Sequence, residues 1–389
     1  MLRRLAAALS VVLAVTILPP SGAPAKAPPT SDVSYDRFVT AGAPLTIPSG
    51  TTSTWTSPDS SPGFAFTELV ASWNADTPSG SLVEVDMQAS PDGSRWTKWY
   101  VMGLWTYDDT IFHRTSVGGQ CDSDGFVAID TFVAGKVPMT SYRLKVVLRR
   151  ASATDPSPTV RALGAMASAT PKKFAVPTAR SYTGAAVLPW AVPQFSQEIH
   201  AGEYPAYDGG GEAWCSPTST TMVLGYWGQY PSAADMAYIP ASYADPQVDY
   251  AARYTFDYHY NGTGNWPFNT AYAARFGLDA FVTRLRSLDE AEAFIRAGIP
   301  LVASIAVDSN KLDGFLFKSS NGHLLVIVGI TADGNVLAND PAATIDATVP
   351  RTYDRGQFED AWLNHSGGIV YVIHPTTTAL PAPPAQANW

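Results

Sequence analysis

Two patterns of hydrophobic and polar positions divide the chain. Between residues 35 and 167, apolar and polar side chains alternate in short runs, as where Tyr142, Leu144 and Val146 are separated by charged residues. Turn-forming segments such as 78–80 interrupt these runs. Because successive side chains of a strand point to opposite faces of a sheet, the pattern predicts an all-β sandwich or jelly-roll domain over residues 35–167.

The pattern changes after residues 168–187, whose Ser, Thr, Pro and Ala content is typical of a linker. Beyond it, apolar residues first recur at helical spacing and then form continuous runs. The expected helices are 217–227, 269–276 and 287–297, and the expected buried strands are 301–307, 324–330, 336–339 and 368–373. Helices followed by a sheet predict an α+β domain at residues 188–374, and the tail 375–389 is expected to be disordered.

The first 25 residues predict a signal peptide. Arg3 and Arg4 precede an apolar run from Leu5 to Leu18, and small residues ending at Ala25 follow it. No later run approaches the ~20 apolar residues that a spanning helix needs. We therefore expect a secreted protein with no membrane span in the mature chain; an uncleaved anchor is the alternative.

Composition narrows the classes of partner. The 389 residues are 46% apolar and carry a formal net charge of -9. This length can bury the cores of two domains, and the negative charge leaves no broad cationic surface for phosphate backbones. Nucleic acid is therefore not an expected partner.

The chain has only two cysteines, Cys121 and Cys215, and in a secreted protein a disulfide between them is the simplest interpretation. The surroundings of Cys215 favour another role. It lies where a glycine-rich loop (209–211) leads into a predicted helix, and Pro217 suits the first turn of that helix. The unpaired N–H groups and the dipole at a helix N-terminus favour the nucleophilic thiolate, and the two cysteines fall in different predicted domains.

A histidine and an aspartate flank a predicted hairpin downstream of the cysteine. His323 precedes the run 324–328, and Asp340 ends the strand that follows the turn at 332–334. A hairpin brings its two outer ends together, so His323 and Asp340 should lie close to each other. A base oriented by a carboxylate and facing a helix-start cysteine is the arrangement that thiol hydrolysis requires.

Four segments in this half resemble the successive motifs of the C-39-like peptidases, which are bacteriocin-processing relatives of the papain fold. The segments are VPQFSQ (192–197), CSPTS (215–219), GHLLVIVG (322–329) and NDP (339–341), and the resemblance covers about residues 188–374. It implies a papain-like cysteine hydrolase in which Cys215 attacks the carbonyl, His323 moves the proton and Asp340 holds the imidazole. It also implies that Gln197 stabilises the oxyanion.

Two positions depart from the family pattern. Ser216 stands where the family usually has glycine, and Gln197 lies farther before the cysteine than usual. The second departure leaves Gln194 as a rival to Gln197.

Aromatic residues supply candidate binding surfaces. Trp214 and Trp266 are predicted to bind substrate; for Trp266, core packing is the alternative. Five aromatic residues of the β-domain could form a platform for cell-wall glycan, although filling of the sandwich core is favoured: Trp96, Trp99, Tyr100, Trp105 and Tyr107.

We expect neither a metal nor another cofactor. The remaining candidate histidines show no metal-ligand spacing with acids or cysteines: His200, His259, His365 and His374.

The predicted function is hydrolysis of peptide bonds by a secreted cysteine peptidase with a peptide or protein as substrate. A cell-wall amidase or transpeptidase could use the same three residues. A third hypothesis is a non-catalytic protein that binds the cell wall through its β-domain.

Overall fold

The computed structural model describes residues 32–171, 190–309 and 311–389. The predicted signal peptide (1–25) and residues 172–187 of the predicted linker lie outside these ranges. Ser168 and Ala169, which were assigned to the linker, instead complete the last strand of the N-terminal unit. No helix in the described ranges is both long enough and apolar enough to cross a membrane.

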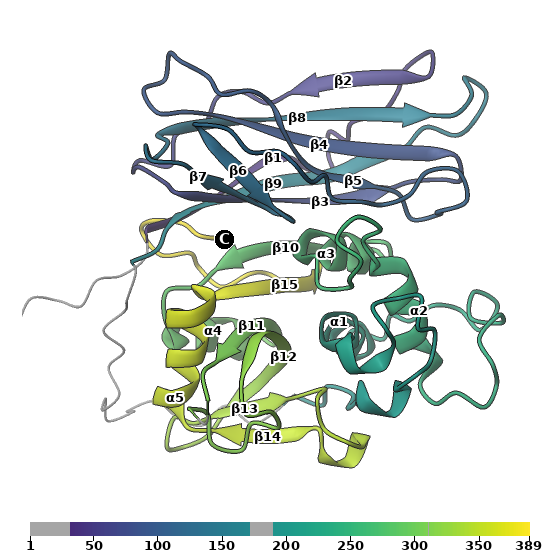
Figure 1. Ribbon diagram of the computed structural model, residues 1–389, viewed down its shortest axis with the longest axis vertical. Helices are drawn as coiled ribbons and strands as arrows, with labels where there is room; N and C mark the ends of the chain where they lie inside the picture. Colours follow the sequence, from purple (N-terminus) through teal and green to yellow (C-terminus); the bar gives the residue numbers. More distant parts are fainter. Residues whose placement is uncertain (1–31, 172–189, 310) are drawn as a thin grey trace, which may run out of the picture.

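The N-terminal unit, residues 32–169, is built from two antiparallel sheets that lie one over the other (Figure 1). One sheet has the order β1-β9-β3-β7-β6 and the other β2-β8-β4-β5. The strands are β1 (Asp32–Val39), β2 (Thr52–Thr56), β3 (Glu68–Asp76), β4 (Ser81–Ser90), β5 (Tyr100–Trp105), β6 (Gly125–Ala128), β7 (Thr131–Ala134), β8 (Ser141–Arg150) and β9 (Thr159–Ala169).

The alternating pattern accounts for the inner faces of these sheets. Val83, Val85 and Met87 of β4 are fully buried, as are Tyr142 and Leu144 of β8. The charged residues between them on β8 stay partly exposed, so one face of the strand packs in the core and the other meets solvent.

The C-terminal unit combines one six-stranded antiparallel sheet with helices. Its strand order is β10-β15-β11-β12-β13-β14. The strands are β10 (Leu278–Arg284), β11 (Leu301–Val307), β12 (Ser320–Ile330), β13 (Val336–Asn339), β14 (Pro350–Tyr353) and β15 (Ile369–Pro375). The helices are α1 (Cys215–Tyr226), α2 (Pro246–Thr255), α3 (Trp266–Ala274), α4 (Leu288–Arg296) and α5 (Arg355–Glu359), with short turns η1 (Glu198–His200), η2 (Gly211–Ala213), η3 (Asp346–Thr348) and η4 (Asp360–Asn364).

The three predicted helices correspond to α1, α3 and α4, and the four predicted strands to β11, β12, β13 and β15. Helices α2 and α5 and strands β10 and β14 were not predicted. Strand β10 escaped because six of its seven residues are buried, which removes the alternation that marks a half-exposed strand.

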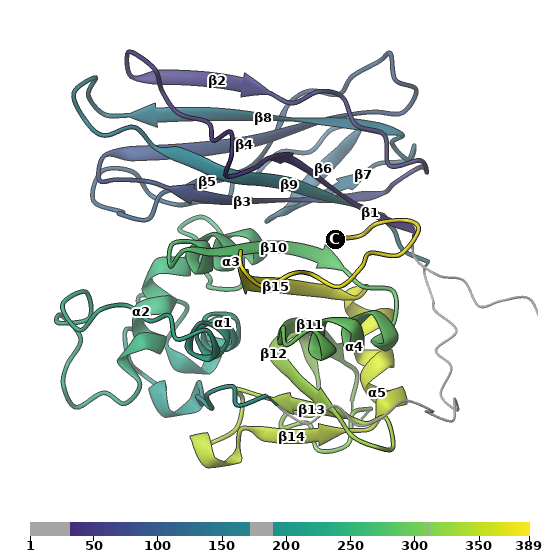
Figure 2. The same ribbon diagram turned by 180° about the vertical axis from the view of Figure 1, so that it is seen from behind.

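The N-terminal unit covers this strand. In both views β10 and α3 lie directly against β3 (Figures 1 and 2). Asp279 of β10 accepts hydrogen bonds from Arg37 Nη1 at 2.8 Å and from Asn74 Nδ2 at 2.8 Å, and Val282 N donates to Ser72 Oγ at 2.9 Å. These hydrogen bonds cross the interface and join the two units.

The prediction of a disordered tail is wrong. Asn388 is fully buried, and its Nδ2 donates to Arg284 O at 2.7 Å and to Glu290 Oε2 at 3.0 Å. The ring of Trp389 packs edge-on against Phe294 with 4.9 Å between centroids. The Thr, Pro and Ala content of the tail suggested disorder, but specific contacts with α4 and β10 hold its last residues.

The five aromatic side chains considered as a glycan platform do not share one exposed surface. Tyr100 and Trp105 are fully buried. The ring of Tyr107 stacks on Tyr254 of α2, whereas Trp96 and Trp99 lie under the guanidinium of Arg143. The alternative of a disulfide is also not realised, because Cys121 and Cys215 are both free thiols.

Candidate active site

Cys215 is the first residue of α1, where the loop through η2 enters the helix. The first N–H groups of a helix have no partner within it, and the positive end of the helix dipole lies at the same place. Pro217 occupies the first turn, where its missing N–H costs no hydrogen bond. The sequence thus places the sulfur in surroundings that favour an anion.

Two buried hydroxyls hold this end of α1 against the sheet. Ser216 Oγ lies 2.9 Å from the hydroxyl of Tyr371 on β15, and Ser219 Oγ donates to Leu324 O on β12 at 3.1 Å. Leu324 is the neighbour of His323, so the second bond sets the distance between helix and histidine strand. The first bond gives a physical reason for the hydroxyl of serine at position 216.

His323 lies on β12, paired in register with Ile305 of β11, and only 2% of it is exposed. Its Nε2 is 2.7 Å from Asp340 Oδ1, which is the proximity expected from the hairpin. The other ring nitrogen, Nδ1, is left to face the Cys215 thiol, with which the imidazole interacts. The rings of Phe315 and Phe317 pack edge-on against the imidazole, with centroids 5.6 and 6.1 Å away.

Asp340 follows β13 and is completely buried. Beside His323 it has two further donors: the Tyr353 hydroxyl at 2.6 Å from Oδ2 and the Ala342 N–H at 3.0 Å from Oδ1. These bonds leave the carboxylate little freedom to rotate. Tyr353, on β14, was not predicted as a site residue, because only tertiary pairing brings it to Asp340.

In the His323–Asp340 pair, each residue favours the charged form of the other. Burial lowers the pKa of His323, but the carboxylate of Asp340 and the nearby Cys215 outweigh it and raise that pKa to about 10. Burial alone would raise the pKa of Asp340, yet His323, Tyr353 and the Ala342 N–H hold it below its usual value. An imidazolium beside a carboxylate is therefore the favoured state of this pair at neutral pH.

The structure separates the two candidate glutamines. Gln197 is 1% exposed and borders the cavity that contains Cys215 and His323, whereas Gln194 is exposed and does not border it. Gln197 Nε2 donates to Glu212 O at 2.6 Å, and an amide nitrogen carries a second hydrogen for another acceptor.

Gly211 permits this approach of the glutamine segment. A Cβ at that position would lie 2.4 Å from Gln197 O and 2.5 Å from His200 C. Any larger residue would push the segment around Gln197 away from the loop that leads to Cys215.

A cavity of about 920 Å³ surrounds the sulfur and the imidazole, and both units of the chain line it. Cys215, Gln197 and His323 border it from the C-terminal unit. Trp266 also borders it, in the position predicted for a substrate-binding residue. From the N-terminal unit, the β6–β7 hairpin contributes the segment 128–131.

Trp214 was predicted to contact substrate, but its side chain does not reach the cavity. It is fully buried, its Nε1 donates to Tyr207 O at 2.7 Å, and it does not border the cavity. The side chain packs in the core behind the nucleophile loop, so the prediction that Trp214 contacts substrate is wrong.

The tip of the β6–β7 hairpin is strained. Ile129 has φ 60°, a value that β-branched residues rarely adopt, and Asp130 N donates to Ala128 O at 2.7 Å around it. A hydrogen bond between residues 128 and 130 around a central residue with positive φ is typical of the rarer form of γ-turn. Ile129 is 38% exposed at the border of the cavity.

Asp130 anchors the hairpin tip to the C-terminal unit. Its Oδ2 accepts the Trp266 N–H, at the start of α3, at 2.8 Å. Burial raises the pKa of Asp130 to about 6, and this hydrogen bond only partly offsets the effect. The hairpin was missed as part of the site because it belongs to the other predicted domain.

The Cys215 sulfur and the His323 imidazole border one cavity, and the buried Asp340 carboxylate is hydrogen-bonded to the imidazole. Thiol-dependent hydrolases use these three kinds of group. Residues 190–370 match the model of the Peptidase C39 like family, and residues 29–168 match that of the Peptidase C39 N-terminal domain. The chain belongs to the C39-like peptidases. This membership implies a hydrolase that acts as a peptidase.

Similar solved structures include a candidate C39-like peptidase from Bacillus anthracis, with 17% identity and a TM-score of 0.31, covering 49% of this chain and 98% of that one. A structure of infectious bursal disease virus, Gx strain, is 11% identical with a TM-score of 0.23, covering 40% of this chain and 37% of that one. FlhE is 11% identical with a TM-score of 0.20, covering 36% and 97%. At these scores the likenesses add nothing to the family match. A comparison with curated proteins found no match.

Replacing Asp340 by asparagine should lower the pKa of His323 from about 10 toward its ordinary value of 6.5, because the carboxylate is the main group that raises it. The folded-state pKa of His323 is raised, so its protonation stabilises the fold fully below pH 6.5, down to the acidic range in which Asp340 itself takes up a proton. That contribution is lost as pH rises through about 10. NMR titration of the imidazole signals, assigned with His323→Gln, measures the shift. Asp333→Asn, an exposed aspartate in the hairpin turn, is the matched control, and an Asp340→Asn protein whose His323 still titrates near 10 would contradict this account.

Proposed function

We propose that the chain is a secreted cysteine peptidase of papain-like fold in which Cys215, His323 and Asp340 form the catalytic triad. The single observation that carries the proposal is the buried His323–Asp340 pair, 2.7 Å apart, whose imidazole also contacts the thiol at the start of α1. The order of helix, histidine strand and carboxylate strand supports the papain-like assignment. Secretion rests on the sequence pattern of residues 1–25.

The proposed reaction has two stages. The Cys215 thiolate adds to the carbonyl carbon of the substrate amide, and the His323 imidazolium then gives its proton to the departing amine as the C–N bond breaks. The neutral imidazole next takes a proton from water, whose oxygen attacks the thioester and releases the acid and the thiolate. Asp340 holds the ring and stabilises its protonated form in both stages.

Gln197 is the proposed donor for the oxyanion that forms on the carbonyl oxygen. Its amide borders the cavity beside Cys215 and retains a hydrogen beyond the one given to Glu212 O. A backbone N–H from the first turn of α1 would be the second donor. Fixed donors of this kind stabilise developing negative charge because they need no reorientation during the reaction.

The β6–β7 hairpin is proposed as a wall of the substrate cleft. Local strain is retained where the surrounding structure requires it and is frequent at ligand-binding sites. Ile129 borders the same cavity as Cys215 and His323 and has an apolar side chain. The N-terminal unit would thus help to select substrate rather than act as a separate module.

The cell-wall amidase hypothesis keeps the same residues and differs only in substrate. A peptide library and cross-linked cell-wall peptides, offered side by side and read by mass spectrometry, separate the two.

Cys215→Ala should reduce cleavage of the preferred substrate by at least about 10³-fold, because no other nucleophile replaces the sulfur. Cys121→Ala, which removes the exposed thiol of the N-terminal unit, should retain wild-type activity. Cleavage of the library that survives Cys215→Ala would eliminate the nucleophile assignment. Iodoacetamide at mildly acidic pH should modify Cys215 before Cys121, although Cys121 is the more exposed.

Gln197→Ala should lower kcat by about 10²–10³-fold with a smaller effect on KM, because an oxyanion donor acts mainly in the transition state. Gln194→Ala is the matched control, three residues away and exposed, and its kinetics should stay near wild type. Steady-state kinetics with one peptide substrate measures both. A larger loss in Gln194→Ala than in Gln197→Ala would reverse the assignment.

Ile129→Gly should raise KM for peptides while leaving kcat nearly unchanged, since it removes an apolar wall but no reacting group. The free energy of unfolding should not fall and could rise by up to about 1 kcal/mol, because glycine adopts φ 60° without strain. Ile129→Asn tests the same point with a residue that tolerates this conformation. If KM is unchanged for every peptide in both variants, the hairpin is not part of the substrate cleft.

A further inference from the structure

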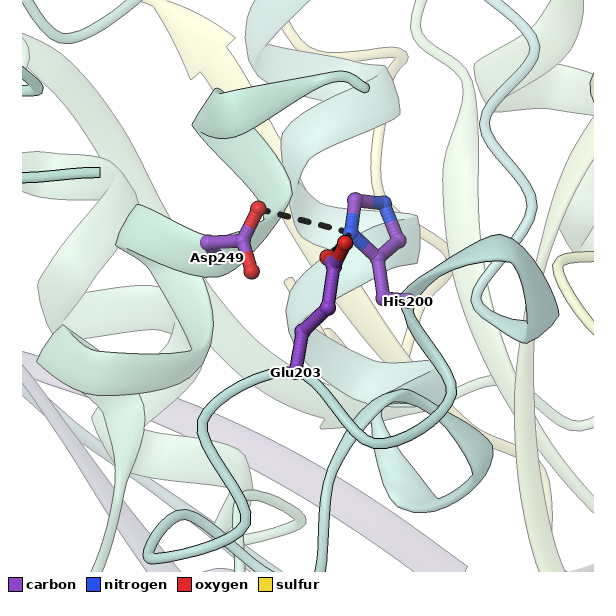
Figure 3. A group of neighbouring side chains, drawn as sticks. All are labelled: His200, Glu203 and Asp249. Atoms are coloured by element: carbon purple, nitrogen blue, oxygen red, sulfur yellow. Dashed lines mark hydrogen bonds and ion pairs between the residues drawn. The ribbon is translucent and has the colours of Figure 1, made fainter. Parts of the chain in front are cut away.

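A histidine and two acidic residues meet at the side of α2, outside the cavity described above. Figure 3 shows His200, the last residue of η1, together with Glu203 from the following loop and Asp249 from the first turn of α2. His200 Nδ1 lies 2.7 Å from Glu203 Oε2 and 3.4 Å from Asp249 Oδ2. One potential ligand atom from each residue lies within 4.8 Å of the others.

Asp249 is left without adequate partners. Only 1% of the residue is exposed, and neither carboxylate oxygen has a hydrogen-bond partner among the described residues. The 3.4 Å contact with His200 is long, and the same Nδ1 is already engaged at 2.7 Å by Glu203. An ionised carboxylate buried without a compensating group is costly, so this arrangement points to something that pairs with it.

A proton on His200 does not supply the missing charge. Protonated histidine balances one carboxylate and leaves the group with a net charge of -1, whereas a divalent cation with neutral imidazole balances both.

We propose that His200, Glu203 and Asp249 bind one divalent transition-metal ion of the zinc class, through an imidazole nitrogen and two carboxylate oxygens. The mixture of nitrogen and oxygen ligands suits Zn²⁺ better than the all-oxygen sites of Ca²⁺. Three protein ligands leave a fourth position for water. The expectation that no metal binds rested on spacing along the chain, which cannot reveal Asp249, since it comes from a different element.

The proposed ion would have a positioning role rather than a catalytic one. None of its three ligands borders the cavity around Cys215. His200 instead lies three residues after Gln197, its N–H donates to Gln197 O at 3.1 Å, and its ring packs 6.0 Å from that of Trp214. A metal ion would tie the segment 197–203 to α2 and so support the loop that precedes Cys215.

The test measures metal binding directly and does not depend on peptidase activity. The full chain without an affinity tag is prepared in a Cys215→Ala background, because the thiolate and imidazole of the active site could themselves bind zinc. After chelation, the protein is dialysed against ZnCl₂, and its metal content is measured by mass spectrometry together with its Tm. We expect one zinc per chain and a rise in Tm on the order of 5 °C at zinc well above Kd.

Two variants locate the site. Asp249→Asn should lose both the bound zinc and the rise in Tm, while its metal-free Tm stays at or above that of the parent, because it removes an unpaired buried charge. Asp245→Asn is the matched control: it removes the same charge four residues away, at a position with φ 43° that asparagine accepts, and should keep both responses.

Three results would overturn the proposal. They are a parent protein that binds no zinc, an Asp249→Asn protein that still binds one equivalent, and a parent stabilised by CaCl₂ but not by ZnCl₂. The last result would discard the zinc-class assignment and indicate an oxygen-preferring cation. None of the three bears on the triad, which is tested separately with peptide substrates.

Discussion

The arrangement of the C-terminal unit depends on keeping a buried ion pair intact. His323 and Asp340 are both almost completely removed from solvent, and charges in that position persist only when each is paired and hydrogen-bonded. Asp340 meets this condition through three donors, one from the imidazole, one from its own turn and one from Tyr353 on β14. The register of β12, β13 and β14 is therefore tied to the chemistry of the site. A slip of one residue in any of these strands would turn His323, Asp340 or Tyr353 away from the other two.

Cys215, the proposed nucleophile, is positioned by the same sheet. Ser216 and Ser219 attach the first turns of α1 to Tyr371 and to Leu324, so the sulfur and the imidazole are carried by elements joined through buried hydrogen bonds. Sites on rigid elements keep their geometry better than sites on loops, and a thiol–imidazole contact requires such precision. The glutamine is the exception, since it lies on an irregular segment held by Gly211 packing and, in our proposal, by a metal ion.

The N-terminal unit is part of this construction. Its β3 covers β10, its Arg37 and Asn74 share the carboxylate of Asp279, and its β6–β7 hairpin reaches the border of the cavity around Cys215 and His323. The hydrogen bond from Trp266 N to Asp130 holds the hairpin against the start of α3. Two matched family models, one for each unit, agree with a chain in which the units occur together. A substrate in the cavity would contact both.

The sequence by itself determined the features that depend on local interactions. Alternation marked the strands of the N-terminal unit, Pro217 and the glycine-rich loop marked a helix that begins at Cys215, and a hairpin turn between two apolar runs brought His323 to Asp340. Tertiary structure decided what depends on contacts between distant segments. Packing buried Trp214 and exposed Gln194, covered both faces of β10, and placed Asp249 beside His200. Local patterns carry no record of such contacts, because burial and pairing at these positions are set by residues far away in the chain.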